Sequence, residues 1–267
     1  MKERLFSLAQ LVALTRTPPQ LLALAARTGC DGAGLRLLPS APGGVHHPLM
    51  DDAPLLRETL AVLRDTGMRV FDLEVVRIGA DFRLAHWQRF LAVGAQLQAR
   101  HVLVAGDDPD EARLIEHFGA LCDAARPFGL TADLEFMPWT AVSDLKTAAR
   151  IVGAVGRDNA GLLIDALHFS RSSSTLDEVA ALPPAWLHYV QVCDGAVPGP
   201  ATVEGMIFDA RCERLLPGEG AIALQALLAR LPAGLPVSIE IPNEARARAM
   251  GHEAWAASCV QAARRVA

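Results

Sequence analysis

The sequence predicts a single (β/α)8 barrel that spans residues 1–267. Three observations support this fold. Short apolar segments alternate with amphipathic segments along the whole chain, at a spacing of roughly 30 residues. The length of 267 residues is that of one such barrel. Several apolar segments end in an acidic or amide side chain, which suits a fold whose strand ends open on one face.

The first four strand and helix units are expected between Leu5 and Ala125. We expect strands at 5–14, 32–38, 69–76 and 101–105, and helices at 20–28, 51–66, 82–99 and 109–125. The Thr17-Pro18-Pro19 sequence marks a helix start, and Gly29 and Gly67 mark helix ends. The stretch 39–48, rich in proline and glycine, is expected to be a loop.

The second four units complete the predicted ring. We expect strands at 130–135, 161–165, 186–192 and 237–241, and helices at 142–155, 172–182, 221–231 and 245–266. Ser143 is expected to cap the helix at 142–155. A long loop is expected from 192 to 220. No G-x-G-x-x-G or G-x-x-x-x-G-K-[ST] motif follows any strand, which argues against a nucleotide-binding open sheet.

Composition limits the expected partners and compartment. The net charge is -5, from 30 acidic and 25 basic residues, so we expect neither nucleic acid nor a membrane as partner. The 5 cysteines form no C-x-x-C pair, which argues against a disulfide framework and a thiolate zinc cluster. The apolar run after Met1-Lys2-Glu3-Arg4 is too short for a secretory signal and no segment has the length needed to span a bilayer, so we expect neither. A cytoplasmic protein is expected.

Four successive expected strands carry an oxygen-bearing side chain near their carboxyl ends. These side chains are Glu135, Asp165, Gln191 and Glu240. A single acid in such a place is more often a helix cap or an ion-pair partner, but the joint occurrence at four strand ends favours one shared site. Three carboxylates in one site repel each other and call for a cation. Oxygen ligands predict Mg²⁺ or Mn²⁺, and an added histidine nitrogen would extend the choice to Co²⁺ or Zn²⁺.

Two histidines and one further acid lie near these strand ends. His168 follows Asp165 by one helical turn, so we expect it to contact the substrate; the alternative is a histidine satisfied by Asp165 or by a backbone carbonyl. His188 is expected to be structural. Glu74, in the third strand, points to the barrel mouth or pairs with an arginine, and no role is assigned to it.

Three arginines and one tryptophan are candidate substrate contacts. Arg211 and Arg214 are expected in the long loop after the seventh strand, where they would hold a substrate carboxylate or phosphate bidentately. Arg77, just past the third strand, would reach the same anion. Trp139, after the fifth strand, is the fourth candidate.

Five short motifs at these strand ends carry a family resemblance. They are Leu134-Glu135, Ile164-Asp165-Ala166-Leu167-His168, Val190-Gln191-Val192-Cys193-Asp194, Pro217-Gly218-Glu219-Gly220 and Ser238-Ile239-Glu240. Together they resemble the xylose-isomerase-like barrel superfamily of sugar-phosphate isomerases and epimerases, over essentially the whole chain and most clearly from Glu135 onward. The resemblance implies that Glu135, Asp165, Gln191 and Glu240 hold the metal and that His168 contacts the substrate.

Gln191 departs from most ketose epimerases of this superfamily, which have histidine there. The pattern Val-Gln-x-x-Asp, then Arg211-x-x-Arg214-x-x-Pro-Gly-x-Gly and Ser-Ile-Glu-Ile-x-Asn, resembles the bacterial 3-dehydroshikimate dehydratases. That branch usually has a histidine shortly after the tryptophan of the fifth strand, and the segment Trp139-Thr140-Ala141-Val142-Ser143 has none.

The leading hypothesis is a metal-dependent isomerase or epimerase that removes a proton next to the carbonyl of a small polyhydroxylated substrate. Glu135 and Glu240 would be the two bases of an epimerase, and His168 the acid or base of a dehydratase. The alternatives are a 3-dehydroshikimate dehydratase-like lyase, an apurinic endonuclease, which the acidic charge balance disfavours, and a metal-free barrel that only binds a metabolite. The size of the barrel is compatible with a homodimer.

Overall fold

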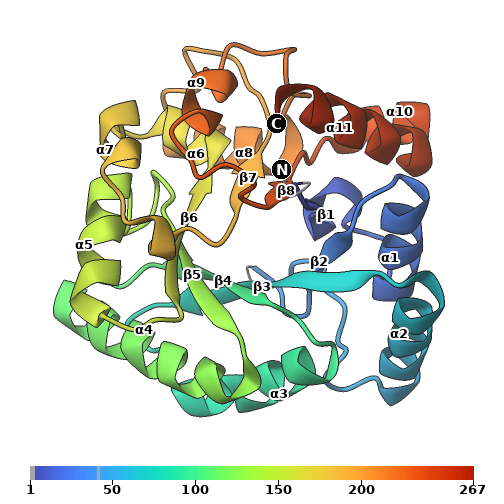
Figure 1. The fold of residues 1–267 in the computed structure, drawn as a ribbon, viewed down its shortest axis with the longest axis horizontal. Helices are drawn as coiled ribbons and strands as arrows, with labels where there is room; N and C mark the ends of the chain where they lie inside the picture. Colours follow the sequence, from blue (N-terminus) through green and yellow to red (C-terminus); the bar gives the residue numbers. More distant parts are fainter. Residues whose placement is uncertain (1–3, 41–42) are drawn as a thin grey trace.

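The computed structural model describes residues 4–40 and 43–267. Eight parallel strands form a closed barrel in chain order, with β8 hydrogen-bonded to β1. Helices surround the ring of strands (Figure 1). The predicted (β/α)8 barrel is therefore confirmed.

The strands differ strongly in length. They are β1 (Phe6–Leu8), β2 (Gly32–Arg36), β3 (Arg69–Ile78), β4 (His101–Gly106), β5 (Thr131–Glu135), β6 (Ala160–Asp165), β7 (Val190–Val192) and β8 (Val237–Ile239). The strand expected at 5–14 ends at Leu8 because a 3-10 helix, η1 (Gln10–Ala13), follows it. The strand expected at 186–192 is likewise shortened by the 3-10 helix η4 (Pro184–Trp186).

The outer helices follow the predicted order with some divisions. They are α1 (Pro18–Arg27), α2 (Ala53–Thr66), α3 (Gln88–Gln96), α4 (Glu111–Ala125), α5 (Leu145–Val155), α6 (Ala166–Arg171), α7 (Leu176–Ala180), α8 (Val203–Cys212), α9 (Leu224–Leu228), α10 (Glu244–Met250) and α11 (His252–Val266). Short 3-10 helices precede α3 and follow α4, at η2 (Leu84–Trp87) and η3 (Arg126–Phe128). The helix expected at 245–266 is two helices, because Gly251 adopts φ 85° between them.

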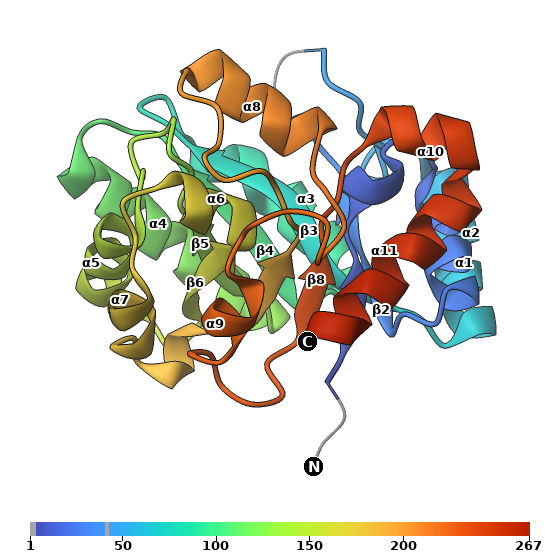
Figure 2. The same ribbon diagram turned by 90° about the horizontal axis from the view of Figure 1, so that it is seen from above.

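Two further expectations about local structure were wrong. The segment 192–220, expected as a loop, contains α8, which lies at the upper edge of the molecule in Figure 2, at one end of the barrel, and beside β7 within the ring of helices in Figure 1. Ser143 does not cap α5: the cap is Asp144, whose Oδ1 accepts a hydrogen bond from the backbone N–H of Thr147 at 2.8 Å. A carboxylate is an equally good N-cap acceptor, and the helix starts at Leu145, three residues later than expected.

Alternate strand residues separate the interior of the barrel from its outer layer. Apolar side chains on the outward faces form one continuous core with the helices. A smaller apolar cluster lies on the inward faces and consists of Phe71, Val75, Leu103, Ala105, Leu163 and Tyr189. Polar side chains occupy the inward positions on either side of this cluster, and those at the carboxyl ends form the site described below. Among the described helices, none combines the length and apolarity needed to cross a bilayer.

Candidate active site

The four predicted strand-end residues meet at the carboxyl end of the barrel. Glu135 ends β5, Asp165 ends β6, Gln191 is the middle residue of β7 and Glu240 directly follows β8. All four are buried, with at most 4% of their surface exposed. In the barrel register Gln191 pairs with Asp165 on one side and with Ser238 on the other. The structure therefore brings Glu135, Asp165 and Glu240 together at this end of the barrel, and Gln191 lies beside Asp165 in the register.

Glu135, Asp165 and His168 form a compact group of metal-type ligands. One ligand atom from each lies within 4.8 Å of the others. The Nε2 atom of His168 is 3.7 Å from Oε1 of Glu135. Asp165 is also the N-cap of α6, since its Oδ1 accepts hydrogen bonds from the backbone N–H groups of Leu167 at 2.8 Å and His168 at 3.0 Å. The same carboxylate thus offers an oxygen to the site and fixes the helix that carries His168.

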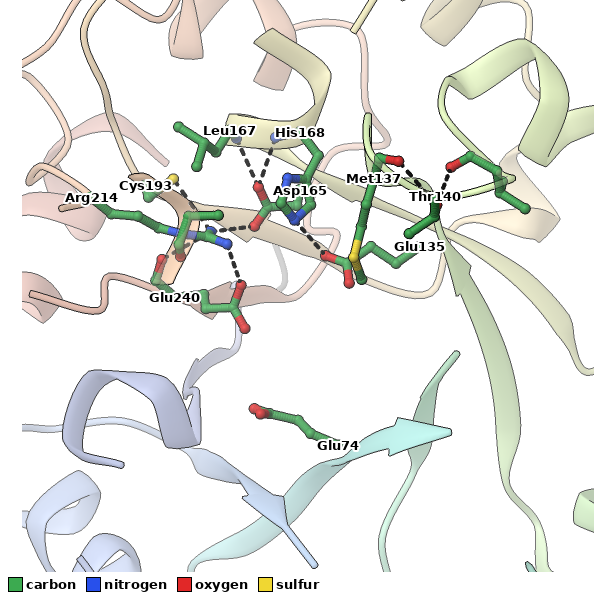
Figure 3. A network of polar contacts seen from close by, with 12 residues as sticks. Glu74, Glu135, Met137, Thr140, Asp165, Leu167, His168, Cys193, Arg214 and Glu240 are labelled. Atoms are coloured by element: carbon green, nitrogen blue, oxygen red, sulfur yellow. Dashed lines mark hydrogen bonds and ion pairs between the residues drawn. The ribbon is translucent and has the colours of Figure 1, made fainter. Parts of the chain in front are cut away.

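Arg214 lies between two of the predicted ligands. Its Nη1 is 2.5 Å from Oδ2 of Asp165 and its Nη2 is 2.9 Å from Oε2 of Glu240. It also donates from Nε to the carbonyl of Ala210 at 2.8 Å and from Nη1 to the carbonyl of Glu240 at 3.2 Å. Figure 3 shows both carboxylates facing the same guanidinium group. Only 2% of Arg214 is exposed, so it is a buried counter-charge at the floor of the site as well as a candidate substrate contact.

Burial and mutual repulsion dominate the electrostatics of the carboxylates. Burial, together with the charges of Glu240 and Asp165, raises the pKa of Glu135 well above its usual value. Burial likewise raises the pKa of Glu240 to about 8, against the opposing effect of Arg214. Burial also acts on Asp165, but Arg214 and His168 outweigh it and lower the pKa of that carboxyl. Burial lowers the pKa of His168 to about 4, so its ring is neutral at pH 7.

The residues of this site fit a divalent cation. Arg214 pairs with two of the three buried carboxyl groups, Asp165 and Glu240, so ionisation of all three calls for a further cation. Buried atoms without a hydrogen-bond partner, among the residues that the structure describes, include Oε1 of Glu135, Nδ1 of His168 and both amide atoms of Gln191. Unsatisfied buried oxygens of this kind are costly unless a cation or water completes them. Carboxylate and amide oxygens with one imidazole suit Mg²⁺, Mn²⁺, Co²⁺ or Zn²⁺.

A cavity of about 290 Å³ lies above these side chains. Its lining brings together Glu135, Glu240 and His168 with all four predicted substrate contacts, Arg77, Arg211, Arg214 and Trp139. The ring of Trp139 stands edge-on to that of His168, with centroids 5.0 Å apart. Met137, Val75 and Leu103 supply apolar surface to the same cavity. Its size is that of a small-molecule site.

Three arginines line the cavity, and two of them pair with an acidic side chain. Arg36 pairs with buried Glu74 at 2.7 Å, and Arg77 pairs with half-exposed Asp107 at 2.9 Å. Arg211, at the end of α8, has no acidic partner among the described residues. Burial and the charges of Arg77 and Arg36 lower the pKa of Arg211, which reflects an excess of positive charge there.

Sequence reasoning missed Arg36 and left Glu74 without a role. Both lie within predicted apolar strands, at β2 and β3, where a charged side chain has no simple reason to be. A charge inside a strand buried on both faces is itself the signal, since such a group must find a partner or a ligand. Here the two residues pair with each other and Arg36 also faces the cavity.

Comparison with known proteins places this geometry in a family. The model of the xylose isomerase-like TIM barrel family matches residues 22–260. The chain therefore belongs to this family, as the strand-end motifs indicated. The inosose isomerases of Bacillus velezensis and Bacillus subtilis are 34% and 32% identical to it over 115 residues. Each match covers 42% of this chain and 38% of the relative, so the chain matches about two fifths of the length of these proteins.

Solved structures share the fold over nearly the whole chain. The IolI protein with a bound zinc atom superposes with a TM-score of 0.80 at 19% identity, covering 98% of this chain and 97% of that one. The D-allulose 3-epimerase of Methylomonas sp. gives a TM-score of 0.69 at 16% identity, with 99% and 98% covered. At such identities the likeness shows the fold alone.

Proposed function

We propose that this protein is a divalent-metal-dependent sugar isomerase or epimerase. It would act by removing a proton from the carbon next to a carbonyl of a small polyhydroxylated substrate. The observation that carries the proposal is the convergence of Glu135, Asp165, His168 and Glu240 at the floor of one cavity. The matched inosose isomerases support the reaction class.

Glu135 and Glu240 are the proposed proton-transfer groups. Both line the cavity, and they come from β5 and β8, which are separated by two strands of the barrel. Two carboxyl groups that reach a substrate from different sides can remove a proton on one face and return one on the other, as an epimerase requires. Their raised pKa values suit general acid–base work near neutral pH.

The metal ligands in this proposal are Glu135, Asp165, Gln191 and Glu240, with His168 adjacent. When bound, a divalent cation supplies polarisation of the substrate carbonyl and stabilises the negative charge that develops on its oxygen. Arg214 holds Asp165 and Glu240 in place through its ion pairs. His168, neutral and packed edge-on against Trp139, would donate a hydrogen bond to a substrate hydroxyl.

The arginines narrow the proposed substrate to one that carries an anionic group. Arg211 has no acidic partner among the described residues, and Arg77 lies close enough to affect its pKa. A substrate carboxylate or phosphate at this wall would relieve the repulsion and accept hydrogen bonds in the fork geometry of guanidinium groups. Trp139 and Met137 would cover the apolar face of the carbon chain or ring.

Proton exchange with solvent tests the proposal. The chain, loaded with Mn²⁺, would be incubated in D₂O with inosose, ketoses and ketose phosphates, and the carbon next to the carbonyl followed by NMR. We expect deuterium at that carbon with at least one substrate, and its loss in Glu135→Gln and Glu240→Gln. Glu111→Gln is the control, since Glu111 is a surface partner of Arg150. Exchange at the normal rate in both site variants would remove these residues from the mechanism.

A dehydratase is the second candidate function. The observation that favours it is the presence of Arg77 and Arg211 in the cavity lining. A carboxylate-bearing substrate such as 3-dehydroshikimate would be held by Arg211 and Arg77. Loss of the β-hydroxyl as water would follow proton removal, with neutral His168 as hydrogen-bond donor to the leaving oxygen and the proton supplied by the carboxyl group that removed it. Incubation with 3-dehydroshikimate would then give an ultraviolet-absorbing aromatic product. Formation of that product without exchange into any sugar would replace the isomerase proposal.

A further inference from the structure

A second group of metal-type ligands lies toward the amino-terminal end of the barrel. His101 is the first residue of β4, Asp133 is the third residue of β5, and His188 lies two residues before β7. One ligand atom of each lies within 4.8 Å of the other two. The active-site residue Glu135 follows Asp133 by two positions, which is about 7 Å along a strand, so the group forms a separate layer of the barrel.

The imidazole rings of His101 and His188 both lie next to the carboxylate of Asp133. Nδ1 of His188 is 2.6 Å from Oδ1 of Asp133, and Nδ1 of His101 is 3.6 Å from Oδ2. The hydroxyl of Thr131 donates to Oδ2 of Asp133 at 2.6 Å and lies 2.8 Å from Nδ1 of His101. Both rings therefore present the same nitrogen to a carboxylate that the threonine holds in a fixed orientation.

Aromatic neighbours hold the ring of His101 in place, and both imidazole side chains stay partly exposed. The ring of His101 packs against Phe71 and Tyr189, with centroids 4.9 Å and 5.0 Å away. Asp133 is buried, whereas the side chains of His101 and His188 keep 13% and 19% of their surface. Three protein ligands leave a fourth tetrahedral position of a zinc ion for a water molecule.

A glycine on the strand between two of these ligands provides the space. Gly161 of β6 pairs with Asp133 in the barrel register. A Cβ atom at this position would overlap Oδ1 of Asp133 and Nδ1 of His188. Any other residue would therefore displace the carboxylate or the imidazole, and glycine keeps the pair together.

We propose that His101, Asp133 and His188 form a second divalent-metal site that binds Zn²⁺ or a similar borderline cation. Two imidazole nitrogens and one carboxylate oxygen are the ligand types that such ions prefer. The hydrogen bond from Thr131 orients the carboxylate, as a neighbouring group does in metal sites. The site joins β4, β5 and the segment just before β7, so a bound ion would cross-link these segments at the barrel end opposite the active site.

The test counts metal ions in the full-length chain. Equilibrium dialysis against low micromolar Zn²⁺, followed by elemental analysis, would be applied to the wild type, to Glu135→Gln/Asp165→Asn, and to that pair combined with His188→Gln. We expect two ions in the wild type, one in the double variant and none in the triple variant. His86→Gln in the double-variant background is the matched control, because His86 is an exposed histidine outside both groups, and we expect it to keep one ion.

Two further measurements distinguish loss of the metal site from misfolding of a variant. Zn²⁺ should raise the melting temperature of the double variant and leave that of the triple variant unchanged. Co²⁺ should give the double variant a visible absorption band that disappears on His188→Gln. Failure of the double variant to bind any zinc, or zinc binding that His101→Gln and His188→Gln both leave unaltered, would overturn the proposal whatever the fate of the proposed activity.

Discussion

The guanidinium group of Arg214 lies 2.5 Å from a carboxylate oxygen of Asp165, beneath the cavity. Asp165 is one of the proposed metal ligands, so in our proposal the same carboxylate pairs with the guanidinium group of Arg214 and binds the metal ion. Glu240, on the other side of Arg214, is in the same position at 2.9 Å. Charge balance at the floor of the site therefore depends on Arg214 and on the metal together.

Replacement of Arg214 should make the fold depend more on metal. In Arg214→Met the carboxylates of Asp165 and Glu240 lose their buried partner, and removing one partner of a buried ion pair typically costs on the order of 3 kcal/mol or more. We expect a lower melting temperature in EDTA and a larger rise on addition of Mn²⁺ than in the wild type. An equal rise in both proteins would show that Arg214 and the metal do not share these carboxylates.

We expect Gln191 to contribute to metal affinity but not to the stability of the metal-free fold. Its two amide atoms are buried without a partner among the described residues, so Gln191→Leu removes unsatisfied polar atoms and should leave the metal-free melting temperature equal or higher. The same change removes a proposed oxygen ligand and should weaken Mn²⁺ binding about tenfold or more, measured by calorimetry. Unchanged Mn²⁺ affinity would exclude Gln191 from the ligand set.

Arg211 should act on substrate binding. Loss of a charged hydrogen bond to an anion costs about 1.5–3 kcal/mol, so Arg211→Gln should raise KM for an anionic substrate roughly 10- to 100-fold with a smaller effect on kcat. Neutral substrates should be unaffected. Arg248→Gln, which alters an exposed pair with Glu244, is the matched control. Equal losses for charged and neutral substrates would contradict an anion-binding role.

The stability of the metal-free chain should fall at acidic pH partly because of His168. Its pKa is about 4 in the fold against 6.5 ordinarily, so between these values the unfolded chain takes up a proton that the folded chain does not. Stability from this residue is complete above pH 6.5 and is lost as the pH falls toward 4. The difference in unfolding free energy between the wild type and His168→Gln should therefore shift by up to about 3 kcal/mol across this window. A constant difference, measured with urea in EDTA, would refute the neutral, buried state of His168.

The sequence predicted the strand-end layer well because the strand period and the parallel barrel leave little freedom. An apolar segment such as 161–165 that ends in an acid puts Asp165 at the mouth, whatever the details of the loops. All four expected substrate contacts also line the cavity.

Contacts that depend on the geometry of the connecting segments could not be predicted from the strand pattern of the sequence. Arg214 reaches Asp165 from just beyond α8, a helix in a segment that we expected to be a loop. The pairing of His188 with Asp133, 55 residues away in the chain, has no local signal. Such partners become visible only when the register of the whole barrel is known.

The central claim is that a divalent cation held by Glu135, Asp165 and Glu240 is required for proton removal next to a carbonyl. The most direct measurement is the rate of deuterium uptake at that carbon in D₂O, for the metal-free chain, the chain restored with Mn²⁺, and Asp165→Asn restored in the same way. We predict uptake only in the restored wild type. Uptake at an undiminished rate in the metal-free chain, or in Asp165→Asn, would contradict this account.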